Sequence, residues 1–90
     1  MSDTLGLLEE AMQLARDVGY VVREEPLGDA AGGVCSVGGR RQILLDAASP
    51  ATERLDLLLG ILADDAAAMA SPMSRLLARH LARRGGLPGN

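Results

Sequence analysis

The adjacent glycines Gly38 and Gly39 constrain the fold of this chain more than any other feature of its sequence. They separate two strand-like runs, 34–37 and 40–45, and a two-residue loop in a type I′ turn needs positive φ at both central positions. The sequence therefore predicts a β-hairpin with these glycines as its turn. The pairs expected across it are Val37 with Arg40, Cys35 with Gln42, and Val34 with Ile43. Because the second strand is apolar on both faces, we expect it to be central in the sheet.

Two regular elements are predicted before the hairpin. The apolar residues of 5–18 fall on one half of a helical wheel, which indicates an amphipathic helix that ends near Gly19. Ser2, Asp3 or Thr4 can cap its start. The run 20–24 begins with Tyr-Val-Val and is typical of a short strand, and turn-forming residues over 26–33 predict a surface loop.

Two more helices are predicted after the hairpin. Ser49 is expected to be the N-cap of the second, with Pro50 at its first helical position. Ser71-Pro72 repeats this signal and predicts a third helix over 72–84. The fold class is therefore α+β: a helix, a three-stranded mainly antiparallel sheet, then two helices, with the first two long helices on one sheet face. We expect one domain over 1–84 and a flexible tail over 85–90.

Composition excludes several classes of protein. With no Phe, no Trp and one Tyr, the core must be small and aliphatic. A single cysteine and an acidic start, MSDTLGLLEE, predict a cytoplasmic protein, and no apolar run approaches the ~20 residues that span a bilayer. Residues 1–70 hold all twelve acidic residues, whereas 71–90 hold four arginines and no acid. Since the net charge is -3, nucleic acid is an improbable partner, although the basic end could attract another anion.

No residue set in the sequence indicates catalysis or metal binding. The run 33–40 lacks the Lys and Ser/Thr of a phosphate loop, and a strand follows it where a helix should begin. Cys35 could act as a nucleophile only with a nearby base, and His80 lies far along the chain. We therefore expect Cys35 to be a small, buried structural side chain, and we predict no catalytic, cofactor-binding or metal-ligating residue.

Two surfaces are candidates for binding a partner. Leu57 and Ile61 lie opposite the main stripe of the second helix, and the third helix can cover them. If that helix folds back as an antiparallel hairpin, the protein can be a monomer; if it extends, the two patches form a homodimer interface, which is the preferred alternative. The interface set is Leu57, Ile61, Met73, Leu76, Leu77 and Leu81. The second surface, Arg75, Arg79 and Arg83, is a solvated face, a contact with the acidic first helix, or a patch for an anionic partner.

The segment 20–62 resembles a group of small bacterial proteins of uncharacterised function. The shared pattern is a GGxC hairpin, here Gly32-Gly33-Val34-Cys35, and an LD-x-x-SP helix start, here 45–50. The order of elements is also distantly similar to the zincin core of ImmA/IrrE-type metallopeptidases, whose corresponding helix carries HExxH. That helix here reads ERLDLLLGILADD and contains no histidine. The resemblance thus implies a related scaffold without the zinc chemistry.

These observations favour a non-enzymatic, cytoplasmic protein-interaction or regulatory module that binds another protein or itself. Two alternatives remain open. The first is a small-molecule-binding or enzymatic role at the Cys35 hairpin, and the second is an adaptor whose basic third helix binds an anionic partner.

Overall fold

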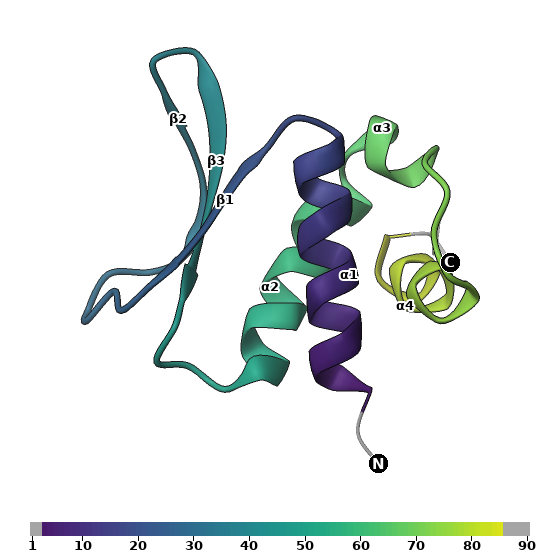
Figure 1. Cartoon of the computed structure of the whole chain (residues 1–90), viewed down its shortest axis with the longest axis horizontal. Helices are drawn as coiled ribbons and strands as arrows, with labels where there is room; N and C mark the ends of the chain where they lie inside the picture. The colour runs from purple at the N-terminus through teal and green to yellow at the C-terminus, as the bar shows by residue number, and fades with distance from the viewer. Residues whose placement is uncertain (1–2, 86–90) are drawn as a thin grey trace.

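A sheet and two long helices form the first two layers of the molecule, and a C-terminal helix adds a third (Figure 1). The computed structural model describes residues 3–85. Its elements in chain order are α1 (Thr4–Asp17), β1 (Val21–Glu25), β2 (Gly33–Val37), β3 (Arg40–Asp46), α2 (Ala51–Ala63), α3 (Ala66–Met69) and α4 (Arg75–Gly85). The predicted α+β class is confirmed, and the predicted flexible tail lies outside the described residues except for Gly85, which ends α4.

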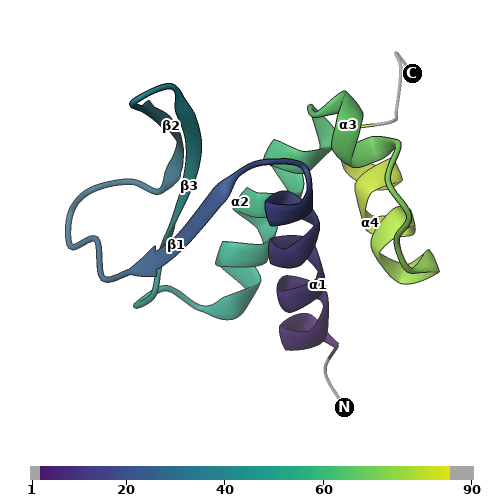
Figure 2. The same cartoon turned by 45° about the horizontal axis from the view of Figure 1, so that its top comes forward.

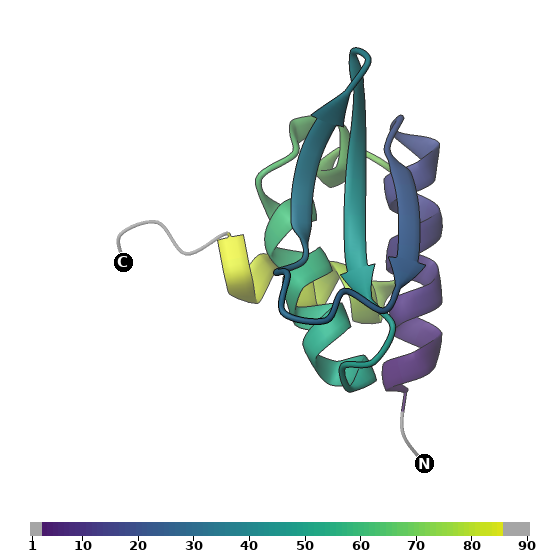
Figure 3. The ribbon, with the colours of Figure 1, turned by 90° about the vertical axis from the view of Figure 1, so that its left-hand side faces the viewer.

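The sheet is mixed, with strand order β1-β3-β2. β3 is the central strand, as its two apolar faces predict; it pairs antiparallel with β2 and parallel with β1. All three predicted hairpin pairs are confirmed: Val37 with Arg40, Cys35 with Gln42, and Val34 with Ile43. α1 and α2 cover one face of the sheet, and Figure 3 looks onto the other face, which no helix of the described chain covers.

Gly38 and Gly39 form the hairpin turn with φ of 59° and 82°, as predicted. Because a β-branched side chain resists positive φ, we expect Gly39→Val to lower the free energy of unfolding by more than ~1 kcal/mol. Gly38→Asn is the matched control, since asparagine is favoured at the first central position of this turn. Denaturant unfolding of both variants measures the difference, and equal stability of Gly39→Val and the wild type would contradict the turn.

The helix ends agree with the sequence in some places and differ in others. α1 ends in a Schellman motif at Gly19, in which Tyr20 N–H donates to Ala15 O and Gly19 N–H to Arg16 O. Asp3 is its N-cap but makes no side-chain capping bond. The predicted N-cap of α2 is wrong: Pro50, with ψ of 148°, is the N-cap, because the Ser49 hydroxyl donates instead to Asp46 O.

The third predicted helix is also corrected. It begins at Arg75, not at residue 72, because the Ser74 hydroxyl accepts from Leu77 N–H and caps the first turn there. A separate short helix, α3, follows α2 and is connected by residues 70–74 to α4 (Figure 2). Figure 1 looks almost along α4 and across α1 and α2, so α4 crosses the long helices and does not form an antiparallel hairpin, which was one of the two alternatives for this helix.

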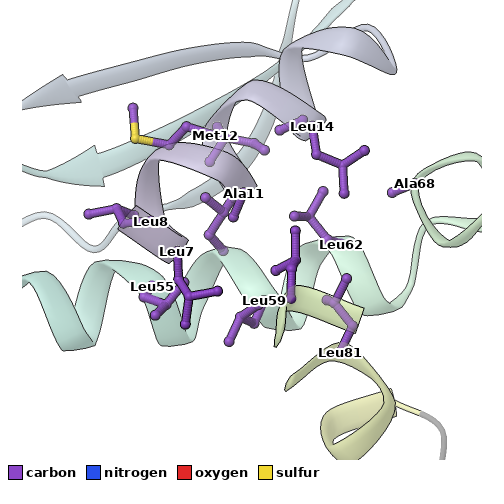
Figure 4. Packing of buried hydrophobic residues seen from close by; sticks show 14 of the residues in the cluster. Leu7, Leu8, Ala11, Met12, Leu14, Leu55, Leu59, Leu62, Ala68 and Leu81 are labelled. Atoms are coloured by element: carbon purple, nitrogen blue, oxygen red, sulfur yellow. The ribbon is translucent and has the colours of Figure 1, made fainter. Parts of the chain in front are cut away.

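The core lies between the sheet and the long helices and continues between those helices and α3 and α4, and it consists of Leu, Ile, Ala and Met side chains with Tyr20. Its largest fully buried side chains are Ile43, Leu45, Leu58, Leu62, Leu77 and Leu81, two each from β3, α2 and α4. Figure 4 shows how α1, α2 and α4 contribute leucines to one cluster, with Ala68 of α3 at its edge. Since burying one such side chain stabilises a fold by about 1.5–3 kcal/mol, α4 is part of the domain.

Candidate interaction surface

β2 is a free edge of the sheet, because the strand order places β3 on one side of it and no strand of residues 3–85 on the other. In a hairpin with a two-residue turn, Val37 and Arg40 exchange both backbone hydrogen bonds, and such pairs alternate along the strands. The backbone N–H and C=O groups therefore point to β3 at Val37, Cys35 and Gly33. At Val34 and Ser36 these groups point outward, where another strand can bind them.

The two edges of the sheet differ in charge. β1 carries Arg23, Glu24 and Glu25, of which Arg23 pairs with Glu25 and Glu24 pairs with Arg54 of α2. β2 carries no charged residue from Gly33 to Val37. Charged side chains on an edge strand oppose pairing with other chains. The β1 edge is thus protected against strand addition, and the β2 edge is not.

An open groove of about 770 Å³ runs along the face of α2 that points away from α1. We call it the α2 groove. Leu57, Gly60 and Ile61 contribute its apolar and backbone lining. A second hollow of about 220 Å³ shares Glu53 and Leu57 with the groove and extends to residues 30–32, directly before β2. The two hollows place the start of the β2 edge beside α2.

Gly32 brings the beginning of β2 into direct contact with β3 and α2. A Cβ atom at this position would lie 2.6 Å from Leu44 O and 3.1 Å from Leu57 Cδ2. The first distance is shorter than real Cβ contacts and involves backbone, so this glycine is required by close approach. The apolar side chain of Leu57 is therefore held at the junction of the α2 groove and the β2 edge.

The α2 groove is acidic at its rim. Glu53, Asp56 and Asp64 line it, and the only basic residue of its lining among the described residues is Arg84. Arg84 Nη1 lies 2.7 Å from Asp56 Oδ1, so this carboxylate is already paired. Glu53 and Asp64 make no ion pair within residues 3–85. The groove thus keeps two unpaired carboxylates.

The predicted interface set is divided by the structure. Leu77 and Leu81 are fully buried in the core of the same chain, so in this structure the third helix folds back. The other four are partly buried and pack against that core: Leu57, Ile61, Met73 and Leu76. Leu57 and Ile61 still line the open α2 groove, and Arg84 is the one described residue of α4 that lines it with them. Homodimerisation itself stays a prediction.

Polar contacts hold both ends of α4 against the long helices. At its start, Glu10 of α1 accepts from Ser74 N–H and from the Ser74 hydroxyl, both at 2.7 Å. At its end, Arg84 pairs with Asp56 of α2. Glu10 is on the polar side of the α1 pattern, and nothing in its spacing indicates a partner 64 residues away.

Arg75, Arg79 and Arg83 lie on one exposed face of α4. None of them makes an ion pair with any residue of 3–85. The reading as a contact with the acidic first helix is therefore wrong, because the acidic contact from α1 goes to Ser74 instead. The two remaining readings are a solvated face and a patch for an anionic partner.

The structure separates Cys35 from His80. Cys35 lies on β2 with its side chain on the uncovered face of the sheet, since it pairs with Gln42 next to the inward-facing Ile43. His80 is on α4, on the far side of the α1 and α2 layer (Figure 1). Cys35 is only half-buried, so the expectation that it is a buried side chain is wrong. The reason is that no helix of residues 3–85 packs on that face of the sheet.

Sequence reasoning missed a polar cluster formed by Tyr20, Arg41 and Asp65. The Tyr20 hydroxyl donates to Asp65 Oδ2 at 2.7 Å, and Arg41 Nη1 donates to both, at 3.0 and 3.2 Å. The guanidinium also lies over the tyrosine ring, 4.1 Å from its centroid. Asp65 accepts from Ala68 N–H as the N-cap of α3. The cluster thereby ties the hairpin to the end of α2.

The environment of this cluster shifts two pKa values. The backbone N–H of Ala68, the Tyr20 hydroxyl and the Arg41 guanidinium stabilise the charged carboxylate and hold the pKa of Asp65 below its ordinary value of 3.8. Burial, together with the neighbouring Asp65, raises the pKa of Tyr20. In the sequence, only the adjacent acids Asp64-Asp65 after a helical pattern hint at such a site, and this pattern is equally typical of a solvated edge. The Asp65 side chain is 8% exposed and is therefore not solvated.

Within residues 3–85, no group of three or more His, Cys, Asp or Glu side chains is placed to hold a metal ion. None of the described helices combines the length and the apolar character needed to cross a bilayer.

No protein-family model matches this chain, and no curated protein or solved structure is significantly similar to it. The resemblances to small bacterial proteins and to the zincin core stay predictions.

Proposed function

We propose that this protein is a non-enzymatic protein-interaction module that binds its partner along the β2 edge and the adjoining α2 groove. The observation that carries the proposal is the uncharged free edge of β2 beside an open groove. In domains that bind by strand addition, backbone hydrogen bonds supply affinity, and pockets for alternate side chains supply specificity. The outward backbone groups of Val34 and Ser36 and the lining residues Leu57 and Ile61 provide these two components.

The other roles draw less support from the described residues. A nucleophile needs a base within hydrogen-bond reach, and the helical layer separates Cys35 from His80. The α4 residues Arg75, Arg79 and Arg83 line neither of the two hollows described above. We further propose that the module acts in the cytoplasm, because its single cysteine is free and cannot form an intrachain disulfide.

Affinity capture with edge variants tests this function. Ser36→Pro removes an outward N–H and places a ring at the edge, which edge strands tolerate, so the variant should fold. Ser36→Thr is the matched control because it keeps the N–H. We expect proteins captured from cell extract by the tagged wild type, including an untagged copy of this chain, to be retained by Ser36→Thr and lost by Ser36→Pro.

A variant with Arg75, Arg79 and Arg83 replaced by glutamine separates the two candidate surfaces. Under the proposal it captures the same proteins as the wild type. Loss of capture in this variant, with full capture by Ser36→Pro, would contradict the proposal and favour the anionic-partner adaptor.

A further inference from the structure

We propose that the partner of the β2 edge is a second copy of this chain, joined through antiparallel pairing of β2 with β2 about a two-fold axis at Cys35. The inference rests on the proposed function, since it names the occupant of the same edge. The resulting sheet would have six strands, and the helices of both copies would lie on one of its faces.

The backbone of β2 is self-complementary about Cys35. The outward-facing residues are Val34 and Ser36, one on each side of the cysteine. With the two-fold axis at Cys35, Val34 of one copy pairs with Ser36 of the other. Ser36 of the first copy likewise pairs with Val34 of the second. Each of these pairs can exchange both backbone hydrogen bonds. Cys35 then faces its own counterpart in a non-hydrogen-bonded pair.

The charges at the two ends of β2 favour the same arrangement. The hairpin tip carries Arg40, and at the opposite end Glu53 of α2 lines the hollow beside Gly32; both side chains are exposed. Neither makes an ion pair among the described residues. Antiparallel pairing brings the end of one copy that carries Arg40 to the end of the other that carries Glu53, twice in each dimer, with Arg40 on the uncovered face and Glu53 on the helix side. The charges at the two ends therefore favour the antiparallel orientation without a direct ion pair.

The exposed apolar side chains of the sheet are on this strand. Val34 is 49% exposed and Val37 54%, although both are β-branched residues in a regular strand. Val34 points to the helix side of the sheet, because its pair Ile43 is fully buried there. A second copy would place its Ser36 opposite Val34 and its own Val34 opposite Ser36, so each exposed Val34 gains a neighbouring strand on the helix side of the sheet. An isologous contact of this kind closes on itself as a dimer.

Light scattering of the purified chain at about 100 μM tests the dimer, with Ser36→Pro and Ser36→Thr as the matched pair. Each substitution occurs twice in the interface, so losing two hydrogen bonds should weaken the Ser36→Pro dimer at least about tenfold. We expect a dimer for the wild type and Ser36→Thr, and a monomer with an unchanged circular dichroism spectrum for Ser36→Pro.

Disulfide formation at the single cysteine tests whether the two β2 strands pair in register about Cys35. Across a non-hydrogen-bonded pair the Cα atoms lie about 4.5 Å apart, within the range that a disulfide can bridge. A mild oxidant such as diamide, which accepts the two thiol hydrogens, should therefore convert the native dimer into a covalent one. In the control variant, with Cys35→Ser and Ser36→Cys combined, the two-residue offset places the cysteines about 8 Å apart, too far to bridge.

Each outcome decides the proposal. A wild-type monomer at 100 μM, or a dimer that Ser36→Pro retains, overturns the β2 pairing. Equal cross-linking of the wild type and the shifted-cysteine control overturns the register about Cys35. A monomeric wild type that still captures a different protein through the β2 edge removes the second copy as partner and leaves the proposed function standing. Loss of both self-association and edge-dependent capture removes both.

Discussion

Replacing Leu81 by alanine is expected to lower the free energy of unfolding by about 2–5 kcal/mol. Leu81 is fully buried where α4 packs against α2 and the rest of the core (Figure 4). The substitution removes the transfer free energy of the lost methyl groups and leaves a cavity in a close-packed interior. A domain of this length has a total stability of roughly 5–13 kcal/mol, so this loss is a large fraction of it.

Leu5→Ala provides the matched control for this change. Leu5 lies in α1 and is 63% exposed, so the same chemical change should alter stability by no more than about 0.5 kcal/mol. Chemical denaturation of both variants gives the two free energies. If Leu81→Ala is as mild as Leu5→Ala, then α4 is not part of the cooperative fold, and the helix is free to extend to another chain.

Replacing Asp65 by alanine is expected to destabilise the protein by about 2–3 kcal/mol at neutral pH. The change removes the N-cap of α3, which alone contributes about 1 kcal/mol, and leaves the buried Tyr20 hydroxyl without its acceptor. It also removes the ion pair with Arg41. Asp64→Ala is the matched control: this neighbouring carboxylate is exposed and unpaired among the described residues, so its loss should change stability by at most about 0.5 kcal/mol.

The stabilisation by Asp65 is expected to depend on pH. Its pKa in the folded protein is lower than in the unfolded chain, so the carboxylate stabilises the fold above the ordinary pKa of 3.8. As the pH falls from about 4 through the folded pKa, the side chain is protonated in both states and the contribution is lost. The stability difference between wild type and Asp65→Asn should therefore shrink below pH 4. A difference that stays constant down to pH 2 would contradict this assignment.

The hairpin and the central position of β3 were predictable because their signals are local. Two adjacent glycines specify a turn, and the turn specifies the register of the strands that follow it. The apolar faces of Ile43, Leu44 and Leu45 then indicate a strand with neighbours on both sides. In the same way, the period of apolar residues in α1 and α2 follows from the geometry of one helix.

The Tyr20, Arg41 and Asp65 cluster was not predictable in this way. Its three members come from the end of α1, from β3 and from the end of α2, and each is bound to the others only because the fold brings those ends together. The bond of Glu10 to Ser74 has the same origin. A single carboxylate in a helical pattern looks the same whether it is solvated or bound to a distant partner.

The sequence by itself determined the two long helices, the three strands, the hairpin register and the apolar, almost non-aromatic character of the core, because turn chemistry and periodicity act between neighbours along the chain. Only the tertiary structure decided which apolar residues of α4 are core and which are surface, and that β2 is the edge left without charge. These properties depend on how elements cross and pair in space. Packing and polar contacts between residues tens of positions apart determine that arrangement. A pattern of neighbouring residues in the sequence does not indicate which distant residues will be in contact.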